Sequence, residues 1–508
     1  MFVGLDAGTS SVKASAYTVT GRLVAVRTAD LKLLQPESGA AEQVPDELFD
    51  QALACLTGCV GDVREAGYSE IAAVSLSSIL GSVIPLSADG SPLGNALTWA
   101  DLRCSTDARD AKSALDEENL YRDTGCQIHS FYVGPKIAWL RRRRPSVFQK
   151  AAHFLPTKAY LVKRLTGEVL IDRSVASGSG LLRLDGPAWN ADWGAYLDIE
   201  PARLGDVVEP FTTLKLLPEV SRGVGLPAGT PLVIGGSDGT LSSLGVGALQ
   251  PGQYAAMLAT SGAFRTVRRQ HALHPETKTW AYYLADGLWV CGTAVSSGGI
   301  VYRWVRDRLF GDEASALMAS GGDGYDVVNA AAASVPRGAG GLLMLPYLSG
   351  ERSPNWNVDA RGILAGLNLS HNRRHFARAA MEGISIHFAQ AAAALMEVCG
   401  PPAEIRATGG FRKSDLWTRI MAEALGFRLS LPPNVDASCL GAALLAMRAS
   451  GVFGSLFDAA KLVPIEDEVV PDPAGVKQYA DLSDLHRRVY ESLCPDFGEI
   501  ASTASSGD

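Results

Sequence analysis

The sequence predicts an α/β fold with two lobes and a cleft between them. Predicted strands alternate with predicted helices along the chain, which is the pattern of α/β proteins. In two places an apolar run ends on an acidic residue, and a turn of small residues follows directly. The first is MFVGLDAGTSSVKA, which contains Asp6, and the second is IGGSDGTLSSLGVG, which contains Asp238. Small residues leave backbone N–H groups and hydroxyls free to surround phosphate oxygens. Because the two junctions lie far apart in the chain, they predict two lobes that meet at a phosphate-handling cleft.

Length and composition are those of a globular protein with several domains. The chain has 508 residues, and about 150 residues per domain gives about two or three domains. Apolar residues make up 47% and charged residues 20% of it, which is ordinary for a folded protein. The formal net charge of −8 argues against nucleic acid as the main partner, because phosphate backbones need clustered Lys and Arg.

Cysteine usage and hydropathy predict a cytoplasmic protein with no membrane partner. The eight cysteines include no CxxC pair, which is typical of buried thiols in a reducing compartment. The first apolar stretch contains Asp6 and is therefore not a signal peptide. The longest uncharged stretch, residues 71–88, contains five serines, Gly81 and Pro85, so it is a poor membrane span.

The first half of the chain predicts a strand meander followed by helices and further strands. Residues 45–66 have helical spacing, with Leu48, Ala52 and Leu56 on one face. The Thr20-Gly21 turn separates the second and third strands. The predicted strands are 2–5, 14–19, 23–26, 71–76 and 232–234, and the predicted helices are 45–66, 132–143, 158–166 and 202–204.

The second half repeats this style after a Pro/Gly junction at 249–252, where we place the domain boundary. A strand at 254–258 runs into another small, hydroxyl-rich turn, Ala259-Thr260-Ser261-Gly262. The remaining predictions are a strand at 405–408, helices at 299–309, 375–398 and 414–425, and a glycine-rich stretch at 338–341. The final residues, ASTASSGD, carry nothing apolar enough to pack and are expected to be disordered.

Asp6 begins the first candidate site, with Gly8, Thr9 and Ser10 behind it. A carboxylate oxygen suits Mg²⁺, often through water, and small donors suit the phosphates of a metal-bound nucleotide. The alternative is a hairpin turn in which Asp6 caps its own backbone. The segment matches neither GxxxxGK[ST] nor GxGxxG, and on this motif alone both interpretations stand.

Asp238 is the second candidate site. A carboxylate flanked by Ser237, Gly239 and Thr240 could accept the proton of a substrate hydroxyl as a phosphoryl group arrives. The alternative is a helix N-cap, because Asp before Gly-Thr-Leu caps well. The two roles are compatible, since capping would favour the ionised acid.

Trp99, Asp101 and Arg103 occupy alternate positions and would share one face of an extended segment. Carboxylate and guanidinium groups bind hydroxyls, and an indole packs on C–H surface, so this face suits a polyol. The alternative is a surface ion pair beside a core tryptophan.

Gly409 and Gly410 follow a predicted strand and precede a helix that opens near Ser414. Paired glycines at such a junction let a flat ring or a phosphate approach the backbone. A simple strand–helix turn is the alternative. Among the other motifs, the polar loop at 347–354 predicts a cleft loop, and Cys439 predicts a packed thiol at a helix start.

In order along the chain, these segments resemble the FGGY family of carbohydrate kinases over nearly the whole length. The matching pieces are GLDAGTSSVKA at 4–14, TWADLR at 98–103, GGSDG at 235–239, ATSGA at 259–263, LPYLSGERSPNWNVDARG at 345–362 and ATGGFRKSDLW at 407–417. The resemblance implies two actin-like (ribonuclease H-like) lobes that transfer the γ-phosphoryl group of MgATP to a hydroxyl of a sugar or sugar acid. It also implies a possible homodimer.

The resemblance gives a role to each matching position and a function to each part of the chain. Residues 1–248 would form the lobe with the sugar site and first phosphate loop, 253–455 the nucleotide-binding lobe, and 456–508 a helical extension. The implied site residues are Asp6 for the metal; Gly8, Thr9 and Ser10 for the first phosphate loop; Asp238 as catalytic base in contact with substrate; Thr260 and Gly262 for the second phosphate loop; Gly299, Gly409, Gly410 and Ser414 for the nucleotide; and Trp99, Asp101 and Arg103 for the sugar.

Within the family, the chain is most similar to gluconate kinases, in TWADLR, DGTLSSLG, GERSPNWNVDARG and SCLGA. One segment departs from that pattern. Many gluconate and xylulose kinases carry Gln-Met-His after the strand that ends here at Ser78, whereas this chain has Ile79-Leu80-Gly81. The expected function is therefore an ATP-dependent kinase of a gluconate-like acceptor. A xylulose or other ketose or polyol kinase, or a non-catalytic nucleotide-binding relative, is the alternative.

Overall fold

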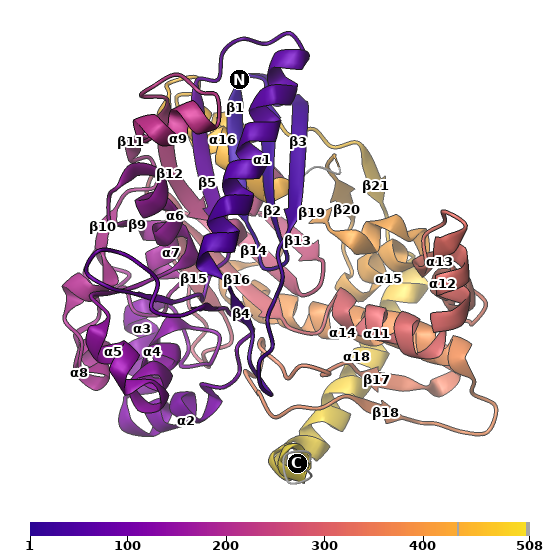
Figure 1. Ribbon diagram of the computed structural model, residues 1–508. Helices are drawn as coiled ribbons and strands as arrows, with labels where there is room; N and C mark the ends of the chain where they lie inside the picture. The colour runs from indigo at the N-terminus through magenta and orange to yellow at the C-terminus, as the bar shows by residue number, and fades with distance from the viewer. Residues whose placement is uncertain (434–435, 504–508) are drawn as a thin grey trace.

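Two large β-sheets lie side by side in the protein, one in each lobe (Figure 1). The computed structural model describes residues 1–433 and 436–503. The first sheet has the order β11-β12-β5-β1-β2-β3. Its strands are β1 (Phe2–Ala7), β2 (Ser11–Tyr17), β3 (Leu23–Asp30), β5 (Ala73–Ser78), β11 (Thr213–Lys215) and β12 (Pro231–Ser237).

The centre of this sheet is parallel and buried. β1 and β5 are buried at every position, as expected of strands covered on both faces. β5 pairs in parallel with β1 on one side and with β12 on the other. A bulge in β12 includes Gly235, where a side-chain Cβ would lie 1.8 Å from the Leu76 carbonyl oxygen. The carboxyl ends of β1, β5 and β12 therefore meet at one edge.

The second sheet repeats the first. Its order is β15-β16-β14-β13-β19-β20-β21, in which β16-β14-β13-β19-β20 has the same directions as β3-β2-β1-β5-β12. Its strands are β13 (Gln253–Leu258), β14 (Gly262–Arg268), β15 (Trp280–Ala285), β16 (Leu288–Val295), β19 (Glu404–Thr408), β20 (Leu429–Leu431) and β21 (Asp467–Val469). The repeat confirms the predicted pair of actin-like lobes.

Helices pack around each sheet, and those within residues 105–150 and 191–197 form a cluster of their own beside the first sheet (Figure 1). In the first lobe they are α1 (Pro45–Glu65), α2 (Ser105–Ala114), α3 (Glu117–Thr124), α4 (Val133–Arg143), α5 (Pro145–Lys150), α6 (Thr157–Thr166), α7 (Arg173–Ser177), α8 (Ala191–Leu197), α9 (Pro218–Gly223) and α10 (Asp238–Gly245). In the second they are α11 (Gly299–Leu309), α12 (Gly311–Ala319), α13 (Tyr325–Ala333), α14 (Arg373–Cys399), α15 (Asp415–Leu425), α18 (Pro473–Leu493) and α19 (Phe497–Thr503).

Helix α16 (Ala437–Ala449) crosses back to the first lobe, and its orange ribbon lies among the indigo strands of Figure 1. It is apolar around its circumference, and residues 439–447 are all buried. Together with α17 (Leu456–Ala460), it belongs to the same hydrophobic core as β1 and β5. The predicted range 253–455 thus contains a helix that completes the core of the other lobe.

Glycines let α16 approach its neighbour α10 closely. A Cβ on Gly245 would lie 1.8 Å from the carbonyl oxygen of Ala437, and one on Gly441 would lie 1.9 Å from that of Leu241. The backbones of the two helices are therefore in direct contact at this crossing, which locks α10, the helix that begins at Asp238.

The end of the chain packs on the second lobe. α18 contacts α14 and α15, and Phe497 of α19 is buried with Tyr490 and Leu343. The prediction of disorder for ASTASSGD is wrong for Ala501–Thr503, which complete α19 around the buried Ala501, while residues 504–508 lie outside the described residues. In the described part of the chain, no helix combines the length and the apolar character needed to cross a bilayer.

Candidate active site

The two predicted acids lie at the same edge of the first sheet. Asp6 is the penultimate residue of β1 and pairs with Ser77 of β5. On the other side of β5, Gly236 of β12 pairs with the same Ser77, and Asp238 follows two residues later. Ligands of α/β sheets bind at the carboxyl ends of such strands. The parallel register therefore brings together two carboxylates that are far apart in the sequence.

Asp6 is a buried carboxylate among other acids. Ser77 donates a hydrogen bond of 2.5 Å from Oγ to Oδ1 of Asp6. Burial, together with the charges of Asp436 and Asp238, raises the pKa of Asp6 to about 8, while Ser77 and Lys13 oppose the shift. This excess of negative charge is the condition that a bound cation relieves.

Asp238 is the first residue of α10 and remains partly exposed. The suggestion that Asp238 caps the helix is wrong, because the side chain of Ser237 accepts the N-cap hydrogen bond from Thr240. Oδ1 of Asp238 instead accepts a hydrogen bond of 2.6 Å from the backbone N–H of Gly239. Burial raises the pKa of Asp238 to about 6, and Arg265 and the Gly239 N–H oppose this. The carboxyl group can exchange a proton near neutral pH.

The turn after β1 is held by side chains from elsewhere in the first lobe. Nε2 of Gln43 donates to the carbonyl oxygens of Gly8 (3.0 Å) and Thr9 (2.8 Å). Trp99 Nε1 donates to the hydroxyl of Thr9 at 2.8 Å. Ser10 is exposed. The sugar-side tryptophan and the first predicted phosphate loop are thus one hydrogen-bonded unit.

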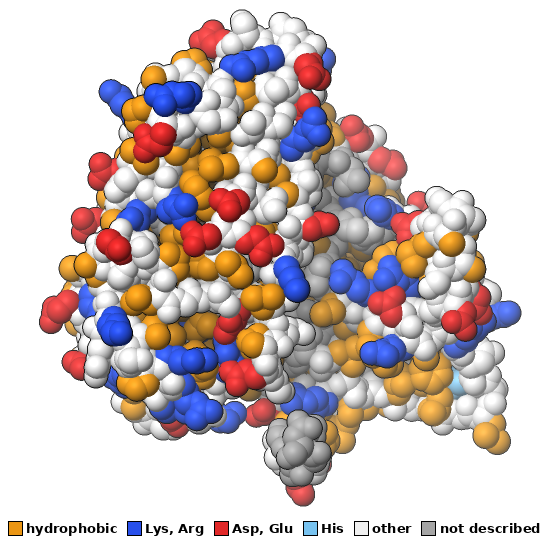
Figure 2. All heavy atoms as spheres, in the orientation of Figure 1, with side chains coloured by type: hydrophobic (Ala, Val, Ile, Leu, Met, Phe, Trp, Pro, Cys, Tyr) orange, Lys and Arg blue, Asp and Glu red, His pale blue; other side chains and the backbone are white. Residues whose placement is uncertain are grey.

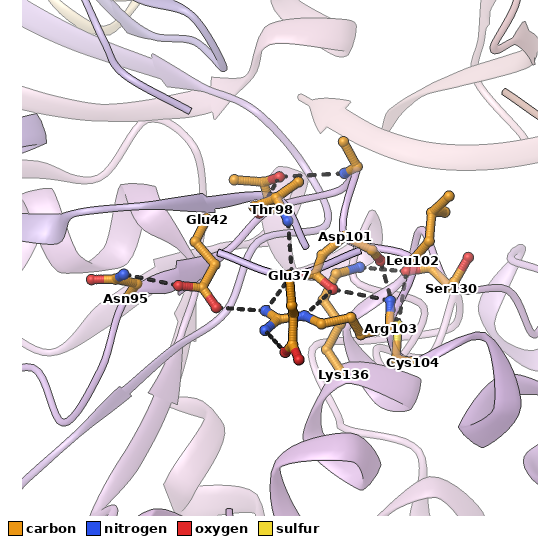
Figure 3. A network of polar contacts seen from close by, with 12 residues as sticks. Glu37, Glu42, Asn95, Thr98, Asp101, Leu102, Arg103, Cys104, Ser130 and Lys136 are labelled. Carbon is orange, nitrogen blue, oxygen red and sulfur yellow. Dashed lines mark hydrogen bonds and ion pairs between the residues drawn. The ribbon is translucent and has the colours of Figure 1, made fainter. Parts of the chain in front are cut away.

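Asp101 and Arg103 do not form the expected open face. The segment after Trp99 is a turn and not a strand, and Arg103 turns inward (Figure 3). Its guanidinium lies 2.6 Å from both Asp101 and Glu42 and 2.7 Å from Glu37, over the ring of Trp139. The expectation of alternate side chains on one extended face is wrong. Both charges are engaged within the protein, and a sugar contact by either stays a prediction.

Four residues predicted to bind nucleotide line one cavity of ≈ 290 Å³ in the second lobe. Thr260 comes from the β13–β14 turn, Gly299 from the start of α11, and Gly410 and Ser414 from the connection between β19 and α15. Aromatic side chains complete the walls: Tyr302, Tyr325, Phe411 and Trp417. Apolar walls with a few polar groups suit a flat heteroaromatic ring.

At this cavity, glycines allow backbone segments of neighbouring elements to lie in direct contact. Gly409 has φ +114°, and a Cβ there would lie 2.1 Å from the carbonyl oxygen of Leu258. A Cβ on Gly299 would lie 2.6 Å from the carbonyl oxygen of Ala259. Gly262 is buried where β14 begins, against Leu258. These glycines hold the predicted second phosphate loop against the nucleotide-side segment, and their ligand contacts stay predictions.

A groove of ≈ 1120 Å³ shares Ala259 and Gly410 with this cavity and extends to residues of the first lobe that neighbour the two acids. It is lined by Gly409 and Gly410 of the second lobe and by Ser242, one helical turn beyond Asp238. It also reaches Lys13, which pairs with Asp6 in the β1–β2 ladder and contacts Asp436 at 2.7 Å. Figure 2 shows the hollow between the lobes with Lys and Arg side chains beside it.

Sequence reasoning missed the cations of this region. Arg265 of β14 is buried, and its guanidinium lies beside the residue after Asp238: a Cβ on Gly239 would be 3.7 Å from Arg265 Nη2. Arg352, in the loop between β17 (Leu343–Leu345) and β18 (Ile363–Ala365), lies over Trp99. Arg265 closely follows the ATSGA motif, but nothing in the sequence says that it crosses to the other lobe's catalytic edge.

The chain matches two protein-family models in succession. Residues 1–245 match the FGGY family of carbohydrate kinases, N-terminal domain, and residues 255–450 match the C-terminal domain of the same family.

Individual proteins match over nearly their whole length. The chain is 35% identical over 502 residues to a gluconokinase of Bacillus subtilis, covering 98% of this chain and 97% of the relative. Two Lactobacillus acidophilus structures, a ligand-bound xylulose kinase and a gluconate kinase, superpose with TM-scores of 0.90 and 0.89. Each is 30% identical to this chain, and each comparison covers 98% of this chain and 99% of the other.

Proposed function

This chain belongs to the FGGY family of carbohydrate kinases, enzymes that transfer phosphoryl from ATP to an alcohol, and we propose that its acceptor is a sugar acid of the gluconate type. The observation that carries the proposal is the pair of acids, Asp6 and Asp238, which the parallel register places at one sheet edge. The gluconokinases among its relatives support the acceptor class. A xylulose-type ketose is the second candidate, because a xylulose kinase superposes equally well.

Asp238 would act as the general base. A base works best when its pKa lies near the working pH, and a carboxyl with a pKa of about 6 is mostly ionised at neutral pH. Its position at the first turn of α10 favours the anion further. It would orient the acceptor hydroxyl toward the γ-phosphate and take its proton as the new P–O bond forms. Positioning and electrostatics would supply most of the rate.

Asp6 fits a Mg²⁺ ion that one carboxylate holds together with water and substrate phosphates, since the described residues contain no cluster of three ligands. Hard carboxylate oxygens are its preferred ligands, and the charge of Asp6 is opposed by nearby Asp436 and Asp238 until a cation is present. Asp6 would hold the ion, and Ser77 fixes the orientation of its carboxylate. When bound, Mg²⁺ neutralises charge on the β- and γ-phosphates of ATP.

The two small-residue turns would hold the phosphates from opposite lobes. Gly8, Thr9 and Ser10 offer backbone N–H groups and hydroxyls from the first lobe, and Thr260 does so from the second. The aromatic cavity next to Thr260 would take the adenosine, with Gly299, Gly410 and Ser414 at its rim. A cytoplasmic location is supported by the eight free cysteine thiols. A homodimer stays a prediction from the resemblance.

An ADP-release assay tests both the reaction and the acceptor. The purified chain is given MgATP with D-gluconate, ketopentoses, pentitols or glycerol, and ADP formation is coupled to NADH oxidation. We expect saturable turnover with gluconate. Asp238→Asn should lower kcat by about 10²–10⁴-fold, because an amide cannot accept the proton. Its affinity for an ATP analogue, measured by calorimetry, should stay unchanged.

The control variant is Asp192→Asn, which removes an exposed carboxylate on α8 of the same lobe and should retain wild-type kcat. Turnover of a ketopentose in place of gluconate would select the second candidate. No turnover with any acceptor, or full activity in Asp238→Asn, would contradict the proposed reaction.

A further inference from the structure

Two buried guanidinium groups lie close together on the acceptor side of the cleft. Arg265 and Arg352 are 6% and 8% exposed. They are near enough that the positive charge of Arg265 lowers the pKa of Arg352, adding to the effect of burial, which brings that pKa to about 10. Both also act on the hydroxyl of Tyr282, which hydrogen-bonds Tyr132 at 2.9 Å.

Among the described residues, neither guanidinium forms a salt bridge, although Arg265 interacts electrostatically with Asp238 at longer range. Within residues 1–433 and 436–503, no carboxylate oxygen lies within 4.0 Å of either one. Three other buried or nearly buried cations are paired with carboxylates: Lys158 with Asp172 at 2.8 Å, Arg378 with Glu382 at 2.7 Å, and Arg103 with Asp101 at 2.6 Å. An unpaired buried charge is costly, so a pair of them in one place is unusual unless an anion binds there.

Most of the hydrogen-bonding capacity of the two arginines is also unused. A guanidinium has five N–H donors. In the described part of the chain, Arg265 makes one side-chain hydrogen bond, from Nη1 to Ser242 Oγ at 2.8 Å, and its buried Nε has no partner. Arg352 makes two, to Ser296 Oγ at 3.2 Å and to the carbonyl oxygen of Val295 at 2.8 Å. By contrast, the buried ammonium of Lys136 donates to three carbonyl oxygens.

The position of the pair ties it to the acceptor. Arg265 packs beside Gly239, and its charge lowers the pKa of Asp238. Arg352 lies over Trp99 and Phe131 of the first lobe, with ring distances of 5.6 and 5.4 Å. The pair therefore spans from the base to the aromatic wall, across the lobe interface. The side chains of Ile79 and Leu80, which follow β5, are apolar and buried.

We propose that Arg265 and Arg352 form the site that binds the carboxylate of the acceptor, so that the enzyme selects polyhydroxy monocarboxylates over neutral sugars and polyols. This inference rests on the proposed function and adds the residues that decide its acceptor. Charge-assisted N–H···O⁻ bonds from a planar guanidinium match a carboxylate in geometry and in charge. A neutral acceptor would leave Arg352 without any anion and Arg265 with Asp238 alone.

Calorimetric binding of the acceptor, without turnover, tests the site. Arg265→Gln and Arg352→Gln should each weaken D-gluconate binding by about 10- to 100-fold, which is the range for a hydrogen bond between charged groups. Binding of the neutral analogue D-glucitol should be weak in the wild type and unchanged in both variants. Arg352→Gln is the cleaner variant, because Arg352 does not act on Asp238. Affinity for an ATP analogue should stay at the wild-type value in each.

Two controls separate charge from fold. Arg265→Lys keeps the charge and should recover part of the lost gluconate affinity. Arg122→Gln removes an exposed arginine on α3 and should leave gluconate binding unchanged. Thermal melts identify any variant that is unfolded. If Arg265→Gln does not fold, the gluconate affinities of Arg265→Lys and Arg352→Gln test the site. Equal wild-type affinity for gluconate and glucitol, or unchanged gluconate affinity in both Gln variants, would overturn this site and leave the kinase reaction standing. Absence of turnover with every acceptor would instead defeat the proposed function.

Discussion

At the scale of single residues, Asp238 shows how neighbours set the chemistry of one carboxyl group. Burial pushes its pKa upward, while Arg265 and the N–H of Gly239 pull it back, and the result is about 6. A carboxyl without this burial would have a pKa near 4 and would be a weaker base. The residue that opposes burial most strongly, Arg265, comes from the other lobe.

We predict that activity rises with pH through about 6, because a general base must be ionised to take a proton. The profile of kcat/KM against pH should show an acidic limb with this midpoint and a plateau above it. Arg265→Gln should move the limb to higher pH, since the cation that favours the ionised form is lost, whereas Arg352→Gln should not move it. The measurement is a steady-state pH series with a saturating coupling system. An acidic limb with the same midpoint in the wild type, Arg265→Gln and Arg352→Gln would contradict this account.

Arg103 illustrates a charged motif used for structure. We expect Arg103→Met to lower the free energy of unfolding by about 3–5 kcal/mol, because Asp101 and Glu42 would lose their buried cation. Urea unfolding followed by circular dichroism measures the loss. The matched control is Glu37→Gln, whose carboxylate is 54% exposed and whose removal should cost less than about 1 kcal/mol. If Arg103→Met instead had normal stability and a raised KM for the acceptor, the result would support the sugar contact predicted from the sequence.

The sequence was informative about residues whose role follows from local pattern. Asp6 and Asp238 each end an apolar run before small residues, so their place at a sheet edge could be inferred. The isolation of Arg265 and Arg352 could not, because a missing counter-ion is a property of three-dimensional neighbours. Arg103 was misjudged for the same reason: its partner Glu42 lies 61 positions away.

At the scale of elements, the crossing of α10 and α16 fixes the catalytic edge. Gly441→Ala should destabilise the fold by about 1–3 kcal/mol, since the new methyl group would lie 1.9 Å from the Leu241 carbonyl oxygen and push the helices apart. Gly61→Ala on α1 is the control, and its effect on the free energy of unfolding should have the opposite sign, because nothing lies within 4 Å of the added methyl group. It should stabilise by about 0.5–1 kcal/mol through helix propensity. Equal effects in the two variants, measured by urea unfolding, would show that the crossing is loose.

Elements with a strong period were predictable almost to the residue. The predicted helix 45–66 is α1 at Pro45–Glu65, and the predicted helix 299–309 is α11. Both have a regular apolar face. The segment at Trp99–Arg103 was misread as extended because alternation over five residues is too short to separate a strand from a turn held by ion pairs. The lobe to which α16 belongs was likewise not predictable, since its uniformly apolar surface indicates burial but not the partner.

At the scale of the whole molecule, both lobes contribute to the side of the cleft where we propose that the acceptor binds. Arg352 of the second lobe lies over Trp99 of the first, and the hydroxyls of Tyr132 and Tyr282 join across the same interface. The nucleotide side is instead an open groove. Binding of both substrates should therefore draw the lobes together around the groove and exclude water from the reacting phosphate.

We predict a smaller radius of gyration by small-angle X-ray scattering when gluconate and a non-hydrolysable ATP analogue are both present than with either alone. ATP hydrolysis without acceptor should be at least about 10²-fold slower than transfer, because the catalytic groups of the two lobes are brought together only when the acceptor is bound. Arg352→Gln should reduce the compaction, whereas the surface variant Arg122→Gln should behave as wild type. Identical scattering curves in all ligand states would argue against closure.

The return of α16 to the first lobe has a consequence for synthesis on the ribosome. The strands β1 to β12 are translated early, yet the helix that covers β1 and β5 emerges only after the entire second sheet up to β20 has been made. At about 5–20 residues per second, that delay is on the order of 10–40 s. During this delay the nascent first sheet lacks the helix that covers part of its apolar surface, so the first third of this chain depends on the last third to complete its core.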